Sequence, residues 1–226
     1  MKIGVLLSGC GVYDGAEIQE SILTLLSIEE IGATAVCISV NKPQHHVINH
    51  LTGEEMNESR NMMIESARIA RGEVKNILEV NPADIDALVI PGGFGSAKNF
   101  TDWAFNGPDG NILPEVKLLL VNLINIGKPI AALCVSPVVL SKALEDSNLS
   151  AKMTIGTDKE ESQYDIQWFS SGIEKVGTTI EMKSVREVLI DTENKIVTAP
   201  CYMMEASILD VRNNIRTAIE ALRDLI

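Results

Sequence analysis

Short, continuous runs of apolar residues alternate with longer stretches in which apolar residues recur every three or four positions. The short runs predict buried strands, and the periodic stretches predict helices with one face on a core. Before residue 140, strands are expected at 3–7, 34–40, 87–90 and 130–133, and helices at about 16–31, 58–71 and 114–126. This alternation predicts an α/β three-layer sandwich with a mainly parallel, flavodoxin-like sheet.

The pattern is less regular after residue 147. Short strands are expected at 153–155, 178–182, 187–190 and 196–199, and a final helix at about 204–225. No internal repeat, low-complexity segment or linker divides the chain. We therefore expect residues 1–226 to form one domain, which is long enough to bury a substantial core.

Three chemically distinctive segments follow predicted strands. Residues 8–11 (SGCG) follow the first strand, residues 91–93 (PGG) follow the strand at 87–90, and Cys134 follows the strand at 130–133. In open α/β sheets, ligands bind at the carboxyl ends of the strands. The three segments are therefore expected to meet at one edge of the sheet and to form the site there.

Cys134 stands where a predicted strand turns directly into a helix. A residue at such a turn is presented above the sheet edge, and the positions two before and two after it must be small, as Ala132 and Ser136 are. The N-terminus of the following helix would favour the thiolate. The backbone amides of Gly93 and Val135 could form an oxyanion hole beside it. These features predict that Cys134 is a nucleophile.

Glu17 is the second candidate, because it follows the first predicted strand at the same sheet edge. Its carboxyl could act as an acid or a base beside the thiol. Alternatively, the spacing Asp14-x-x-Glu17 fits a helix cap in which Glu17 turns back on its own helix. The residues alone support both interpretations equally.

The remaining cysteines and the histidines are weaker candidates. Cys37 lies inside a predicted strand and is expected to be a packing residue, whereas Cys10, in a glycine-flanked loop, is a minor functional candidate. No two cysteines have C-x-x-C spacing, and the histidines form a cluster apart from the cysteines at His45, His46 and His50. A metal site is therefore not expected.

Composition narrows the range of functions. The chain has 46% hydrophobic and 22% charged residues and a formal net charge of −12. An acidic protein repels nucleic acid and anionic lipid, so neither is an expected partner. No apolar run approaches the ~18 residues that span a bilayer, and the first run is too short for a secretory signal. We therefore expect a cytoplasmic protein.

Several motifs resemble a known group of proteins. Residues 88–100 (LVIPGGFGSAKNF), the elbow at 130–137 (IAALCVSP) and a glutamate after the first strand resemble the PfpI and parkinsonism-associated deglycase superfamily, whose fold is class I glutamine amidotransferase-like. Residues 8–20 (SGCGVYDGAEIQE) and 47–61 (VINHLTGEEMNESRN) are similar to the ElbB-like glyoxalase family in particular. The likeness covers most of the chain and is densest in residues 1–140.

The resemblance implies roles for four residues. By it, Cys134 is the elbow nucleophile, Glu17 is the carboxyl that hydrogen-bonds it, and Gly93 and Val135 supply the oxyanion-hole amides. It also implies a homodimer and an enzyme that converts glyoxal, a small dicarbonyl, to glycolate without a cofactor. That activity could reflect deglycase activity.

The chain departs from the superfamily pattern in its histidines. Many members carry a histidine soon after the strand that follows the elbow helix, but residues 154–158 read TIGTD and no histidine occurs after His50. Protease-like members also have a histidine directly after the cysteine, where this chain has Val135. Amidotransferase and protease activities are therefore disfavoured, and weak glyoxalase-like lyase activity is expected. The alternative is a non-enzymatic redox-sensing or regulatory binding protein, because a reactive cysteine also reacts with peroxide.

The polar segment at 41–57 is longer than the ~2–6 residues usual between elements of an α/β unit. We expect it to cover the site or to contact a partner subunit. His50 is expected to be the most buried of its histidines, because Val47, Ile48 and Leu51 flank it.

Overall fold

The computed structural model describes residues 1–147 and 149–226. A seven-stranded sheet has the order β3-β2-β1-β4-β5-β9-β8. Its strands are β1 (Lys2–Leu7), β2 (Thr34–Ser39), β3 (Lys75–Asn76), β4 (Ala87–Ile90), β5 (Ile130–Leu133), β8 (Leu189–Asp191) and β9 (Ile196–Ala199). A separate parallel pair is formed by β6 (Lys152–Met153) and β7 (Thr179–Ile180).

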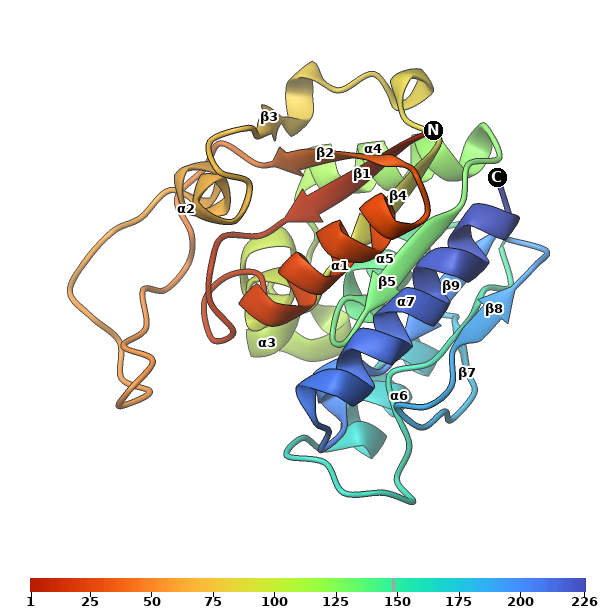
Figure 1. Ribbon diagram of the computed structural model, residues 1–226. Coiled ribbons are helices and arrows are strands. Elements are labelled where there is room, and N and C mark those ends of the chain that lie inside the picture. The colour runs from red at the N-terminus through yellow and green to blue at the C-terminus, as the bar shows by residue number, and fades with distance from the viewer. Residues whose placement is uncertain (148) are drawn as a thin grey trace.

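Helices cover both faces of the large sheet (Figure 1). They are α1 (Ile18–Glu30), α2 (Met62–Ile69), α3 (Trp103–Asn106), α4 (Pro114–Asn125), α5 (Pro137–Leu144), α6 (Ile166–Lys175) and α7 (Ile208–Asp224). In Figure 1, α1 and α7 lie in front of the sheet, and α4 and α5 lie behind it. Every neighbouring pair of its strands is parallel except β8 and β9. The predicted α/β sandwich with a mainly parallel sheet is therefore confirmed.

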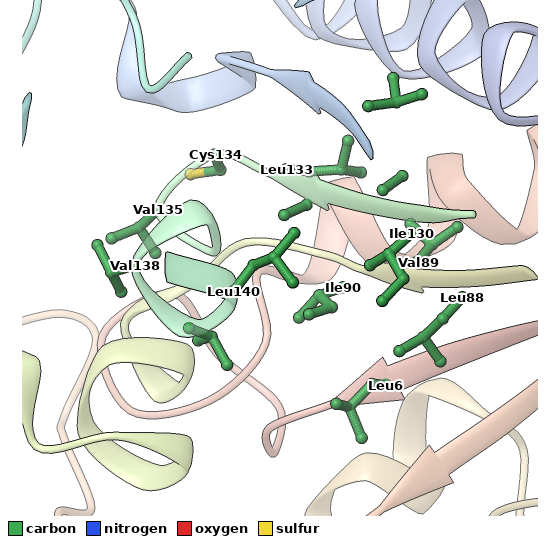
Figure 2. Close-up of a cluster of buried hydrophobic side chains, with 14 of the residues drawn as sticks. Leu6, Leu88, Val89, Ile90, Ile130, Leu133, Cys134, Val135, Val138 and Leu140 are labelled. Atoms are coloured by element: carbon green, nitrogen blue, oxygen red, sulfur yellow. The ribbon is translucent and has the colours of Figure 1, made fainter. Parts of the chain in front are cut away.

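The centre of the core is formed by β4 and β5. Every residue of both strands is fully buried, because helices cover the two faces of the sheet. Figure 2 shows Leu88, Ile90 and Ile130 in this cluster, with Cys134 beyond the end of β5. The apolar core thus extends up to the candidate site at Cys134.

Most of the predicted elements are present, and the differences are local. The strands expected before residue 140 are found as β1, β2, β4 and β5. The short helices α3 and α6 were not predicted, and α1 begins at Ile18, two residues later than expected. No helix among the described residues is both long and apolar enough to cross a bilayer.

The polar segment at 41–57 extends away from the sheet beside α2 (Figure 1). It contacts the loop between β1 and α1, where the Ile48 N–H donates to Asp14 Oδ2 at 2.7 Å. The prediction that His50 is the most buried histidine is wrong, because its side chain is 38% exposed whereas that of His46 is 23% exposed. Leu51, which was expected to cover His50, is instead almost fully exposed.

Candidate active site

The candidate site lies at the carboxyl edge of four adjacent strands, β1, β4, β5 and β9. Cys134 directly follows β5, and its backbone is in the left-handed region at φ 56°. Its N–H donates to the carbonyl of Ala199, the last residue of β9, at 2.9 Å. A left-handed backbone costs a non-glycine residue about 1–2 kcal/mol. Here it turns the chain sharply from β5 toward α5, as predicted for this position.

The carboxyl beside this thiol belongs to Glu20, in the first turn of α1. Glu20 is fully buried, and its Oε1 accepts a hydrogen bond from the Tyr202 N–H at 3.1 Å. Its Oε2 makes no hydrogen bond of ordinary geometry to a described residue. It is in contact of hydrogen-bond type with the Cys134 thiol. Glu20 and Cys134 therefore form a buried pair.

The two groups meet at Gly92, just after β4. A Cβ on Gly92 would lie 2.2 Å from Oε2 of Glu20, 2.3 Å from Cβ of Cys134 and 2.7 Å from its sulfur. No side chain fits between the carboxyl and the thiol. The next residue, Gly93, has φ 102°, a conformation that glycine adopts readily. The close approach of the backbone at Gly92 is therefore what brings the pair together.

Glu17 does not take the place beside the thiol that the resemblance implied; it caps its own helix, which is the alternative that the residues left open. Its backbone is extended, and it is the N-cap of α1, with Oε2 accepting from the Glu20 N–H at 2.6 Å. Its own N–H donates to the Gly92 carbonyl at 2.8 Å. Because α1 begins only after Glu17, the residue that faces inward from its first turn is Glu20. The structure thus shows Glu17 as a cap and brings Glu20 to the thiol in its place.

Burial controls the protonation of the pair. Burial, together with the negative charge of Glu17, raises the pKa of Glu20 to about 8. Burial also raises the pKa of the Cys134 thiol well above its usual value, and the charges of Glu20 and Cys201 act in the same direction. In the resting protein at neutral pH, the carboxyl and the thiol therefore both hold their protons.

The expected stabilisation of a thiolate by α5 is not seen. Pro137 begins this helix and has no N–H, while the N–H groups of Ser136 and Val138 donate to carbonyls within the turn. Two amides are left near the sulfur, those of Gly93 and Val135. Neither donates to a backbone carbonyl of the described chain, and the Gly93 N–H contacts the sulfur of Cys134. The turn therefore presents isolated donors rather than a helix end.

A cavity of about 300 Å³ is lined by residues that are hydrogen-bonded to Glu20, although neither Glu20 nor Cys134 lines it. Its wall includes Glu17, Tyr164 and Tyr202, and the last two come from loops that precede α6 and α7. Burial raises the pKa of the Tyr164 phenol to about 12, and negative charge on Cys134 and Glu20 acts in the same direction. Only 6% of Cys134 is exposed, so the residue is almost closed off from solvent.

Comparison with known proteins places this site in a family. A model of the DJ-1/PfpI family matches residues 10–199. The chain belongs to the DJ-1/PfpI family. Its superfamily and its class I glutamine amidotransferase-like fold, both predicted from the motifs, are thereby confirmed.

Two relatives align with almost the whole DJ-1/PfpI chain. The human glutamine amidotransferase-like class 1 domain-containing protein 3, mitochondrial, is 35% identical over 99% of this chain and 83% of the relative. The rat ES1 protein homolog, mitochondrial, is 34% identical over 99% of this chain and 84% of the relative. These names contradict the prediction of a cytoplasmic protein. That prediction rested on the shortness of the first apolar run, which is insensitive to targeting signals of other kinds.

Solved structures agree with the assignment. An isoprenoid biosynthesis protein with an amidotransferase-like domain from Ehrlichia chaffeensis is 35% identical, with a TM-score of 0.90 over 100% of this chain and 99% of that one. Glyoxalase III from Candida albicans has a TM-score of 0.61 over 98% of this chain and 97% of that one. At 15% identity, the second likeness shows the fold alone.

The other cysteines of this DJ-1/PfpI protein differ in their surroundings. Cys37 is buried in β2, as predicted, and burial raises its pKa to about 11. Cys10 is half-buried near Glu65, away from the pair. Cys201 was not predicted as part of the site, although it follows β9 at the same sheet edge. It is fully buried with φ 47°, and its sulfur contacts the Cys134 N–H.

Metal ligands and histidines do not gather at this site. Within residues 1–147 and 149–226, no group of three or more His, Cys, Asp or Glu side chains is placed to hold a metal ion. The three histidines lie between β2 and α2, and none of them lines the cavity. The titratable side chain in contact with the Cys134 thiol is Glu20.

Gly92→Ala should destabilise the protein by about 3 kcal/mol, because the added methyl group would overlap Cys134 and Glu20. Gly127→Ala is the matched control. Gly127 also has no side chain, but nothing lies within 4 Å of an added Cβ, and its φ of 72° alone should cost about 1–2 kcal/mol. Urea unfolding of the three proteins measures the difference, and equal losses in the two variants would contradict the packing described for Gly92.

The raised pKa of Glu20 predicts a loss of stability with rising pH. Between the ordinary carboxyl pKa of 4.5 and about 8, the folded protein holds a proton that the unfolded chain has released. Stability should therefore fall across this window by up to about 1.4 kcal/mol per pH unit. Glu20→Gln should remove this contribution, whereas Glu193→Gln, in the turn after β8, should retain it. Parallel stability–pH curves for wild type and Glu20→Gln would show that Glu20 titrates normally.

Proposed function

We propose that this DJ-1/PfpI protein converts small dicarbonyls such as glyoxal to 2-hydroxy acids such as glycolate. Cys134 acts as the nucleophile, and Glu20 carries the protons. The observation that supports this most strongly is the buried Glu20 carboxyl beside the thiol, with a pKa of about 8. A group with such a pKa both accepts and releases a proton near neutral pH. Thiol addition and proton transfer require no cofactor.

The reaction begins when the sulfur of Cys134 bonds to one aldehyde carbon of glyoxal. The thiol proton passes to the Glu20 carboxylate, and the former carbonyl oxygen then takes it up to complete a hemithioacetal. Next, the hydrogen on the attacked carbon moves with its electron pair to the second carbon, and the hemithioacetal hydroxyl proton passes through Glu20 to the second oxygen. The second carbon thereby becomes a CH₂OH group, and the attacked carbon becomes a thioester carbonyl. Water cleaves the thioester and restores the thiol. One glyoxal and one water give one glycolic acid.

The backbone around the sulfur suits the charge that develops. When the sulfur adds to the aldehyde, the carbonyl oxygen becomes negative before it is protonated. The N–H groups of Gly93 and Val135, which are free of backbone carbonyl partners in the described chain, are assigned to this oxygen. Donors fixed in a buried site stabilise such charge far better than water does. These two amides are therefore the proposed oxyanion hole.

Competing functions have less support. Amidotransferase chemistry of the Cys-His-Glu type needs a histidine beside the thiol, and all three histidines of this chain lie in the segment before α2. A peroxide sensor needs a thiolate at neutral pH. Burial instead raises the pKa of Cys134, so the thiol reacts only when a base removes its proton. This requirement favours an enzyme in which Glu20 is that base.

The proposal predicts how glycolate formation from glyoxal changes in three variants. Cys134→Ala should abolish it, and Glu20→Gln should lower kcat about 10²- to 10⁴-fold, which is the usual contribution of a positioned acid or base. Glu193→Gln, far from the site, should behave as wild type. In wild type the rate should rise with pH through about 8, because the Glu20 carboxylate forms there.

Product should be measured directly, by chromatography of glycolate, rather than by loss of glyoxal, because arginine and lysine side chains also consume glyoxal. Equal turnover by wild type and Cys134→Ala would refute the thiol step. A normal rate and pH profile in Glu20→Gln would leave Cys134 as the nucleophile but remove Glu20 from the mechanism.

A further inference from the structure

The cavity lined by Glu17 and Tyr202, the two residues hydrogen-bonded to Glu20, has an acidic mouth. Its wall includes the carboxyls of Glu17 and Glu205, together with Tyr13, Tyr164 and Tyr202. Among the described residues that line it, none is Lys, Arg or His. A small molecule that approaches the thiol here meets negative charge that no cation of the wall offsets.

Neighbouring charges do not reverse this balance. The segment that contributes Tyr164, residues 157–165 (TDKEESQYD), contains four acidic residues and one lysine. Of the nearby cations, Arg186 is paired with the Glu160 carboxylate. Lys98, which donates to the Tyr13 carbonyl at 2.8 Å, keeps its charge, but it is a single cation against the acidic residues of the wall and of this segment. The field at the mouth is therefore negative.

The wall of the cavity is bonded directly to the reacting pair. The Tyr202 N–H donates to one oxygen of Glu20, and the Glu17 carboxyl accepts from the Glu20 N–H. Glu20 in turn faces Cys134, which is only 6% exposed. A molecule that reaches the sulfur from this cavity must therefore pass close to Glu17.

The two carboxyls are held in place. Glu17 is fixed as the cap of α1, and Oε2 of Glu205 accepts from Gln163 Nε2 at 2.9 Å. These hydrogen bonds keep both carboxyls at the wall of the cavity, where they repel an approaching anion. Two unit charges at distances of several ångströms in a water-like dielectric should lower the rate at which an anion reaches the thiol by about fivefold.

We infer that Glu17 and Glu205 determine specificity by charge: uncharged small dicarbonyls reach Cys134, and aldehydes that bear a carboxylate or phosphate are repelled. That the reactant is a dicarbonyl rests on the proposed function, but the selection by charge does not. Glu17 and Glu205 touch the approaching molecule rather than the reacting atoms.

The test compares two alkylating agents, uncharged iodoacetamide and anionic iodoacetate, on the full chain at low salt. Mass spectrometry follows alkylation of Cys134, and free cysteine gives the intrinsic ratio of the two rates. The iodoacetamide-to-iodoacetate ratio at Cys134 should exceed that of free cysteine about fivefold. It should fall toward the free-cysteine value in Glu17→Gln/Glu205→Gln and at about 0.5 M salt, where exposed charges are screened.

A control variant separates local from overall charge. Glu73→Gln/Glu193→Gln removes the same amount of charge from the loop before β3 and from the turn between β8 and β9. Both positions lie at the end of the sheet where the parallel strands begin, opposite the candidate site. It should keep the wild-type ratio. The inference is overturned by a wild-type ratio equal to that of free cysteine, by an unchanged ratio in Glu17→Gln/Glu205→Gln, or by a Cys134 that neither agent alkylates.

A second measurement distinguishes this inference from the proposed function. Turnover of glyoxal is compared with that of glyoxylate, an aldehyde of similar size that carries a carboxylate. Charge selection predicts that Glu17→Gln/Glu205→Gln narrows the difference in kcat/KM by raising the value for glyoxylate. If glyoxal is not converted at all, the proposed function fails, and the alkylation ratio still decides whether the mouth selects by charge.

Discussion

The arrangement of the site depends on one constraint, which is that a carboxyl and a thiol must meet across a residue with no side chain. Glu20 comes from α1, and Cys134 directly follows β5. Gly92 lies just after β4, the strand next to β5 in the sheet. The Glu17 N–H fastens the start of α1 to the Gly92 carbonyl. Three parts of the chain that are distant in sequence are thereby brought into contact.

Bringing the carboxyl and the thiol together in the interior lowers the stability of the fold, but it also changes the protonation of both groups. A fully buried carboxyl with one oxygen outside any ordinary hydrogen bond is expensive to ionise, which is why its pKa rises to about 8. The left-handed backbone of Cys134 adds strain at the same point. The extensive apolar core around β4 and β5 maintains both. The result is a carboxyl that titrates near neutral pH beside a thiol, which is the pair that the proposed reaction uses.

The fold and the position of the nucleophile could be predicted from the sequence, whereas the partner carboxyl could not. Strands buried on both faces are continuous apolar runs, so β4 and β5 are evident, and the small residues around Cys134 mark the sharp turn. The choice between Glu17 and Glu20 depends on where α1 begins. Residues 16–20 all tolerate a helix, and its start is set by the long-range bond to Gly92, which no local pattern reveals. The contribution of Cys201 is likewise tertiary, although α6 could have been found from the helical spacing of Ile166, Phe169 and Ile173.

Protonation of Glu20 beside Cys134 at neutral pH can be measured by difference infrared spectroscopy between pH 6 and pH 10, with Glu20→Gln to assign the band. We expect a protonated-carboxyl C=O band that belongs to Glu20 and disappears with a midpoint near pH 8. A Glu20 that is already ionised at pH 6 would contradict this expectation.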